Sequence, residues 1–117
     1  LLDLFKEILE IEGGNALREV SQIEFYNLTE IFTLNLDNPA EEIRRTCIEM
    51  LFYLNPETAF MFLDTIINDN NMWNKMRVVE ILEYFDDPRG IEAIKKLAED
   101  PEEMVSEKAK ILLQNKQ

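Results

Sequence analysis

Apolar residues recur at helical spacing along almost the whole chain, and short polar breaks rich in proline, glycine and asparagine separate the runs. The strict two-residue alternation that is typical of a half-buried strand persists nowhere. The pattern therefore predicts an all-α protein with helices over residues 1–12, 40–54, 59–67 and 73–85. Shorter helical patterns cover residues 16–20, 23–32, 91–98 and 105–113.

Small and apolar positions also recur every 31 residues. Four columns keep this register: Ala16, Cys47, Val78 and Ala109; Val20, Leu51, Leu82 and Leu113; Phe5, Leu36, Ile67 and Ala98; and Leu1, Phe32, Leu63 and Ile94. A repeated helix pair cannot bury its apolar face alone, so neighbouring pairs stack and share a core. The register predicts a right-handed α-solenoid of about four antiparallel helix pairs, in units of approximately 1–22, 23–54, 55–85 and 86–114. Because the chain opens inside a helical pattern, we expect residues 1–117 to form a single domain that is a fragment of a longer chain.

Polar residues followed by proline mark most of the breaks: Asn38-Pro39, Asn55-Pro56, Asp87-Pro88 and Asp100-Pro101. Proline is tolerated in the first turn of a helix, where carboxylates cap free amide groups and face the positive end of the helix dipole. We expect the acids of the last two turns to cap helices in this way: Asp86, Asp87, Glu99, Asp100, Glu102 and Glu103. The alternative, a calcium site, lacks the ligand spacing of an EF-hand loop.

The composition narrows the class of partner. Acidic residues number 24 and basic residues 12, and the resulting formal charge of −12 repels phosphate backbones and anionic lipid head groups. We therefore expect no nucleic-acid partner. No run approaches the roughly 20 apolar residues of a membrane-spanning helix, so we expect no direct membrane insertion. A cytoplasmic domain is expected, and the sequence is also compatible with a soluble domain of a larger, membrane-anchored protein.

Candidate catalytic groups are few. The single cysteine, Cys47, occupies a column of small core residues, and the chain has no histidine to activate a thiol or to bind zinc. We expect Cys47 to be buried and inert. Glu80 and Glu83 are three residues apart on a helix and are expected to be solvated rather than to act as an acid–base pair. The sequence thus predicts no catalytic residue, no metal site and no cofactor, and hence no enzyme.

The segment from Asp87 to Leu113 resembles the short HEAT-like repeats of the phycobilisome-lyase type. It contains Asp87-Pro88-Arg89-Gly90-Ile91, then Ala93-Ile94, and a second turn at Asp100-Pro101. The pair Ile43-Arg44 is similar to the Val-Arg pair of such repeats. The resemblance implies an armadillo-like superhelix with a turn-to-arginine ladder, here from Asp37 or Asn38 to Arg44 and from Asp69 to Lys75. The last unit lacks the basic residue of this ladder.

Proteins with HEAT-like repeats include adaptors, enzyme subunits, a few lyases and a few DNA-repair proteins. The resemblance is thus unspecific for function. The repeat, the absence of a catalytic constellation and an apolar stripe on the inner helices favour a non-catalytic scaffold that binds a partner helix or peptide on its concave face. The alternative is an enzyme-associated module such as a bilin-lyase-type subunit. A DNA-repair role comes third, because it requires a basic groove and this chain is acidic. Neither the oligomeric state nor the identity of a partner follows from the sequence.

In HEAT-like proteins the second helix of each pair lines the concave face. On that basis the candidate partner-binding residues are Arg45, Ile48, Phe52, Trp73, Met76, Val79 and Glu83. Contiguous exposed apolar residues mark interaction surfaces, but adjacent repeats can equally bury such a stripe. Both readings remain open for Ile48, Phe52, Met76 and Val79. Trp73 is either a binding hot spot or a cover for the turn below it.

Overall fold

Helices make up the regular structure of the protein in its computed structural model, which describes residues 22–116. They are α3 (Gln22–Leu34), α4 (Glu41–Leu54), α5 (Pro56–Met61), α6 (Leu63–Ile67), α7 (Met72–Leu82), α8 (Pro88–Leu97) and α9 (Glu103–Lys116). No strand occurs between residues 22 and 116, so the all-α prediction is confirmed there. The helical patterns predicted over 1–12 and 16–20 lie outside the described residues.

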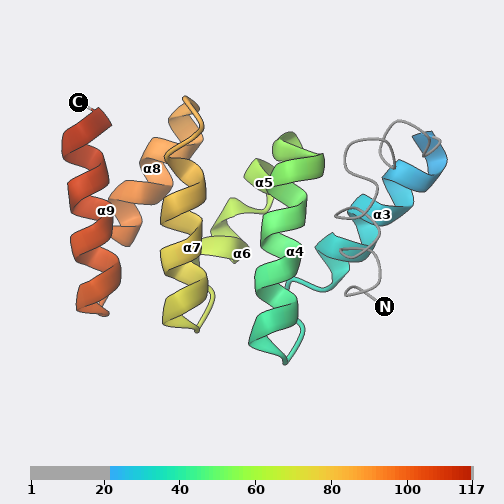
Figure 1. Cartoon of the computed structure of the whole chain (residues 1–117), viewed down its shortest axis with the longest axis horizontal. Helices are drawn as coiled ribbons and strands as arrows, with labels where there is room; N and C mark the ends of the chain where they lie inside the picture. The colour runs from blue at the N-terminus through green and yellow to red at the C-terminus, as the bar shows by residue number, and fades with distance from the viewer. Residues whose placement is uncertain (1–21, 117) are drawn as a thin grey trace, which may run out of the picture.

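The helices form two layers. Figure 1 shows α4, α7 and α9 side by side in one layer, with α5, α6 and α8 behind them at an angle. Within the first layer α7 packs between α4 and α9, and α8 packs against both α7 and α9. Helix α3 packs against α4. The amino-terminal ends of α4, α7 and α9 therefore lie along one edge of the molecule, and their carboxyl-terminal ends lie along the opposite edge (Figure 1).

The turn before each first-layer helix is built in the same way. A side-chain oxygen accepts a hydrogen bond from the backbone amide two residues later, which starts the turn and satisfies a free donor. The three bonds recur with the 31-residue register: Ala40 N to Asn38 Oδ1 (2.8 Å), Asn71 N to Asp69 Oδ1 (2.9 Å) and Glu102 N to Asp100 Oδ1 (2.9 Å). Asp87 accepts from Arg89 N at 2.8 Å in the same manner and is the N-cap of α8, so its predicted capping role is confirmed, whereas Asp100 accepts from an amide that precedes α9 and closes the turn before that helix.

Two predicted helix boundaries were wrong. The helix expected over 59–67 begins earlier, at Pro56, where the Asn55 side chain accepts from Thr58 N. It is also interrupted at Phe62, whose backbone leaves the helical region with φ −101° and ψ 16°. The helix expected over 73–85 ends at Leu82, because residues 83 and 84 form a turn.

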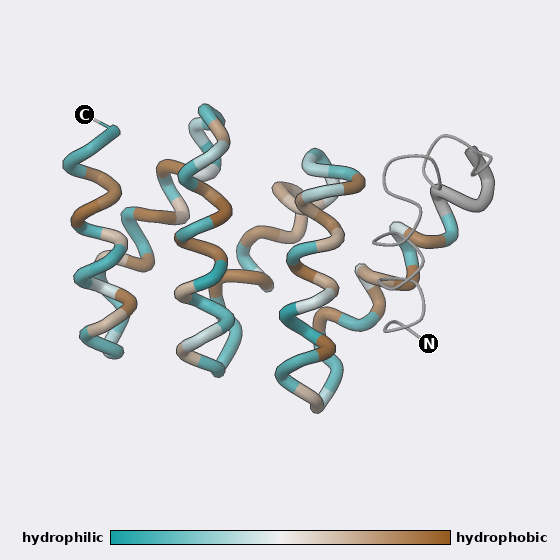
Figure 2. Tube along the Cα trace, viewed as in Figure 1, coloured by the Kyte–Doolittle hydropathy of each residue, from teal (hydrophilic) through white to brown (hydrophobic). Residues whose placement is uncertain are grey.

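The repeating columns form the core. Cys47, Val78 and Ala109 are fully buried, and Leu51 and Leu82 are buried beside them. Two further columns are buried over the described residues, one with Phe32, Leu63 and Ile94 and the other with Leu36 and Ile67. Ala98 and Leu113 are partly buried against this core. Figure 2 shows the corresponding hydrophobic bands along α4, α7 and α9, separated by polar stretches. The predicted core columns are therefore confirmed over the described residues.

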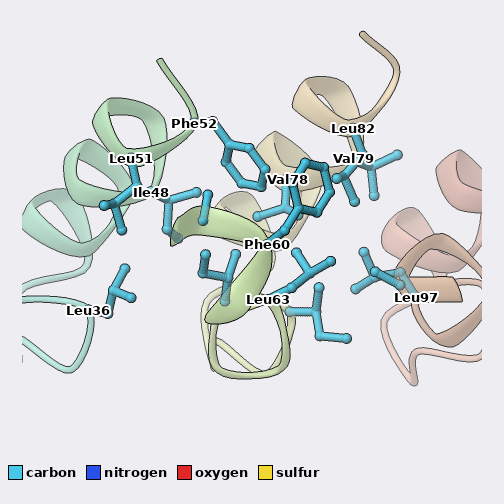
Figure 3. Packing of buried hydrophobic residues seen from close by; sticks show 14 of the residues in the cluster. Leu36, Ile48, Leu51, Phe52, Phe60, Leu63, Val78, Val79, Leu82 and Leu97 are labelled. Atoms are coloured by element: carbon cyan, nitrogen blue, oxygen red, sulfur yellow. The ribbon is translucent and has the colours of Figure 1, made fainter. Parts of the chain in front are cut away.

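The buried arc of the first-layer helices is wider than predicted. Ile48 (2% exposed), Phe52 (4%) and Val79 (1%) were candidates for an exposed stripe, but all three are buried. The reason is that α4 and α7 are covered on two sides, by the second layer and by the next first-layer helix. Figure 3 shows Phe52 reaching from α4 into the space between the helices, toward Phe60. The two rings meet edge to face, with centroids 5.6 Å apart.

A buried polar network connects α4 to α7. Arg44 donates to both carboxylate oxygens of Asp69, at 2.9 Å from Nε and 3.2 Å from Nη2. Asn74 is fully buried, donates to Asp69 (3.3 Å) and to Glu41 O (3.1 Å), and accepts from Arg45 Nη1 (3.0 Å). Among the described residues no buried side-chain nitrogen or oxygen lacks a hydrogen-bond partner. The network is fully satisfied, which makes it rigid.

This network corrects the predicted ladder of turn acids and helix cations. The expected pairing ran within a unit, but the ion pairs run between units: Arg44 pairs with Asp69, and Lys75 pairs with Asp100 at 2.6 Å. Within its own unit Arg44 reaches only backbone, donating to Asn38 O at 2.8 Å. Arg44 and Lys75 therefore each connect their own helix to the turn that precedes the next first-layer helix, because that turn carries Asp69 or Asp100.

The Asp69 network makes stability depend on pH. Burial by itself raises the pKa of Asp69, but hydrogen bonds from Arg44, from the Asn71 amide and from Asn74 outweigh burial and hold the pKa below its ordinary value. The folded protein therefore binds a proton at Asp69 less readily than the unfolded chain does. The stabilisation is present above the ordinary carboxyl pKa of about 4 and is lost as the pH falls through the lower folded value.

We accordingly expect Asp69→Asn to flatten the acid limb of the stability curve. The free energy of unfolding, measured by urea denaturation between about pH 4.5 and pH 2.5, should fall less steeply in Asp69→Asn than in the wild type, because the variant has no proton to bind at this position. Parallel curves for the two proteins would show that Asp69 is not held below its ordinary pKa.

Candidate functional site

The structure disperses the residues that the sequence grouped as a binding stripe. Ile48, Phe52 and Val79 are buried, and Met76 is half-buried against the core, so these four contribute little to an accessible surface. Arg45 is half-buried and holds the Asn74 side chain. Of the set, only Trp73 and Glu83 are exposed. They lie at opposite ends of α7, so they do not form one site.

A groove lies instead between the carboxyl-terminal halves of α4 and α7. It encloses about 240 Å³, and its apolar lining comes from Phe52, Ile81 and Phe85. Two tyrosines complete it: Tyr53, which is 64% exposed, and Tyr84, which is 84% exposed. We refer to the hollow lined by these five residues as the tyrosine groove.

The two tyrosines occupy equivalent repeat positions, because 31 residues separate them. Sequence reasoning missed them, since it followed the apolar columns only. The signal was nevertheless present, because an aromatic residue repeats in register near the end of α4 and in the turn just after α7. An aromatic side chain that is largely exposed leaves a large apolar area in water, and such area marks interaction surfaces.

A chain of ion pairs crosses the first layer beside the tyrosine groove. Arg77 of α7 pairs with Glu49 of α4 at 3.2 Å and with Glu80 at 3.0 Å. Glu80 in turn pairs with Lys108 of α9 at 3.5 Å. Glu49 and Arg77 also line the groove. Arg77, the cation in the lining of the tyrosine groove, is thus already engaged by carboxylates.

A second, smaller groove lies between α7 and α9 and encloses about 120 Å³. Its lining includes Glu80, Glu83, Lys108 and Asn115, and Asn115 occupies the repeat position of Tyr53 and Tyr84. This groove has no aromatic residue in its lining. Of these two grooves, therefore, only the one between α4 and α7 has exposed aromatic side chains in its lining.

Cys47 is buried, as predicted. Burial raises the pKa of the Cys47 thiol to about 12, so the thiol stays protonated near neutral pH. A protonated and inaccessible thiol is neither a nucleophile nor a metal ligand. Within residues 22–116 no group of three or more cysteine and carboxylate side chains is placed to hold a metal ion.

Comparison with known proteins adds no relative. No family model, no curated protein and no solved structure matches this chain. In the part of the chain that the structure describes, no helix has the length and apolar character needed to span a membrane. The candidate site therefore stands on its geometry alone.

The burial of Cys47 has a direct chemical consequence. In the native protein the thiol should not react with the thiol reagent DTNB over an hour at pH 8, and it should react fully once urea unfolds the chain. The extent of reaction of the native and of the unfolded protein is measured by the absorbance of the thiolate that DTNB releases. Rapid reaction of the native protein would mean that the column of Cys47, Val78 and Ala109 opens readily to solvent.

Proposed function

We propose that this domain is a HEAT-like α-solenoid module whose function is non-catalytic protein binding, with the tyrosine groove as the binding site. The observation that carries the proposal is the pair of exposed tyrosines, Tyr53 and Tyr84, beside a hollow with an apolar lining. Tyrosine is enriched in protein interfaces because it supplies a large contact area at low cost in conformational entropy.

Three features support the solenoid architecture. Core columns repeat at a spacing of 31 residues, the turn before each first-layer helix repeats the same side-chain bond, and each basic ladder residue reaches the next unit. The two-layer arrangement of Figure 1 follows the same order, with each unit contacting its neighbours. A right-handed stack of units would present α4, α7 and α9 together as a single face.

The size of the tyrosine groove favours part of a protein over a small molecule as its ligand. Pockets for cofactors and other small ligands usually enclose roughly 300–1,000 Å³ and bury most of the ligand. The tyrosine groove has a volume of about 240 Å³ and is open to solvent. A bilin-lyase-type module would have to enclose a tetrapyrrole, so this geometry favours the scaffold hypothesis. The bound partner would be a peptide segment or a helix that presents one anchoring side chain.

Site-specific crosslinking tests the proposal. We expect p-benzoylphenylalanine introduced in place of Tyr84 in the full-length protein, in cells of its source, to crosslink a defined protein partner under ultraviolet light. The matched control is the same residue in place of Met61, which is 70% exposed but lies in the second layer.

A second change at the far side of the groove makes the test specific. Tyr53→Ser should abolish the crosslink from position 84, because it removes half of the aromatic surface while leaving the core intact. Equal crosslinking from positions 84 and 61, or none from either, would overturn the proposed site.

A further inference from the structure

We propose that Lys116, the last residue of α9, positions the turn that carries Tyr84 and Phe85 and so maintains the shape of the tyrosine groove. Lys116 lies outside the lining of the groove and acts on it through the backbone of this turn. The binding role of the groove rests on the proposed function, whereas the positioning of the turn can be measured without a partner.

The turn after α7 leaves backbone carbonyl groups that its own helix cannot satisfy. Residues 83 and 84 form the turn, and residues 85–87 connect it to α8. The amides of Tyr84 and Phe85 donate back to Ile81 O (3.1 Å) and Leu82 O (3.2 Å) at the end of α7. The carbonyl groups at the carboxyl-terminal end of a helix have no amide partner within that helix, so their donors must come from elsewhere.

Lys116 supplies such a donor. Its Nζ donates to Glu83 O at 3.2 Å and to Phe85 O at 3.3 Å, the two carbonyl groups that flank Tyr84. Only 14% of the Lys116 side chain is exposed, so its apolar stem is packed and its amine is held at these carbonyl groups. The Asp86 carboxylate lies 3.8 Å from Nζ but is fully exposed, so this ion pair adds little. The two bonds to the backbone are therefore the main contacts of the amine.

The repeat register shows which contact Lys116 replaces. The pair of Glu83 and Lys116 follows the pair of Phe52 and Phe85 by 31 residues at both positions. Phe52 and Phe85 pack against each other with ring centroids 5.6 Å apart. One repeat later the equivalent contact is an amine on a backbone carbonyl oxygen. The turn is thus held from two sides, because the Phe85 ring packs against α4 and Lys116 of α9 fixes the Phe85 backbone.

Amide hydrogen exchange measured by NMR tests the positioning role. Lys116→Met keeps most of the apolar stem and removes the amine. The amides of Tyr84 and Phe85 should then exchange at least about tenfold faster, because hydrogen bonds from a charged donor contribute enough free energy for a change of that size. Lys116→Arg should keep the wild-type rates, since a guanidinium can donate to the same carbonyl groups.

Two matched controls separate this role from charge and from global stability. Lys110→Met makes the same chemical change at an exposed lysine of α9 that pairs only with Glu107. Ile66→Val lowers global stability from a buried position in α6, away from the turn. Neither control should accelerate exchange at Tyr84 and Phe85. Unchanged rates in Lys116→Met, or equal acceleration in either control, would overturn the inference.

Crosslinking connects the positioning of the turn to binding. With p-benzoylphenylalanine at position 84 of the full-length protein, Lys116→Met should lower the yield of the partner crosslink several-fold, and Lys110→Met should leave it unchanged. The reason is that the residue at position 84 is carried by the turn that Lys116 fixes.

The two proposals fail in different ways. Faster exchange of the turn amides in Lys116→Met, without a site-specific crosslink in the wild type, would support the role of Lys116 and refute the groove as a binding site. A partner crosslink whose yield does not change in Lys116→Met, together with unchanged exchange, would refute the role of Lys116 and leave the binding site standing.

Discussion

The carboxylate of Asp69 is the point at which two repeats are joined. It accepts hydrogen bonds from Arg44 of α4, from Asn74 of α7 and from the amide of Asn71 in the turn between the layers. Removing one partner from a buried charged pair leaves a desolvated charge behind, which is far more costly than losing an exposed pair. The orientation of α7 relative to α4 therefore depends on this network, and the apolar columns then close around it.

The position of the tyrosine groove follows from that constraint. Tyr53 lies on α4 and Tyr84 lies in the turn after α7, so the hollow between them exists only while the two helices keep their spacing. Beneath it, Phe52, Phe60 and Phe85 pack with ring centroids 5.5–5.6 Å apart. Helices α4 and α7 are thus held together at both ends. Hydrogen bonds to Asp69 connect their amino-terminal ends, and aromatic packing connects the regions near their carboxyl-terminal ends.

Periodicity and local sequence predicted the helices between residues 22 and 116, the core columns and the cap at Asp87, because each depends on local chemistry or on register. It could not predict the break at Phe62, where neither proline nor glycine signals an interruption. It also placed Phe52 outside the core, because a helical wheel assumes one buried face, whereas α4 packs against two layers of neighbours. The prediction for Arg44 was wrong because it considered only acids within the same unit, whereas the carboxylate that pairs with Arg44 belongs to Asp69, 25 residues further along the chain. To find Tyr53 and Tyr84 from the sequence, the 31-residue spacing has to be followed at exposed positions as well as at buried ones.

The most direct test of the account is a double-mutant cycle for Arg44→Ala and Asp69→Ala, with the free energy of unfolding measured by urea denaturation at pH 7. The account predicts a coupling energy of about 2 kcal/mol, which is typical of contacting groups in a shared network. The exposed pair of Glu92 and Lys95, analysed in the same way, should give no more than about 0.5 kcal/mol. Equal and small coupling in both cycles would contradict the claim that Asp69 joins the two repeats.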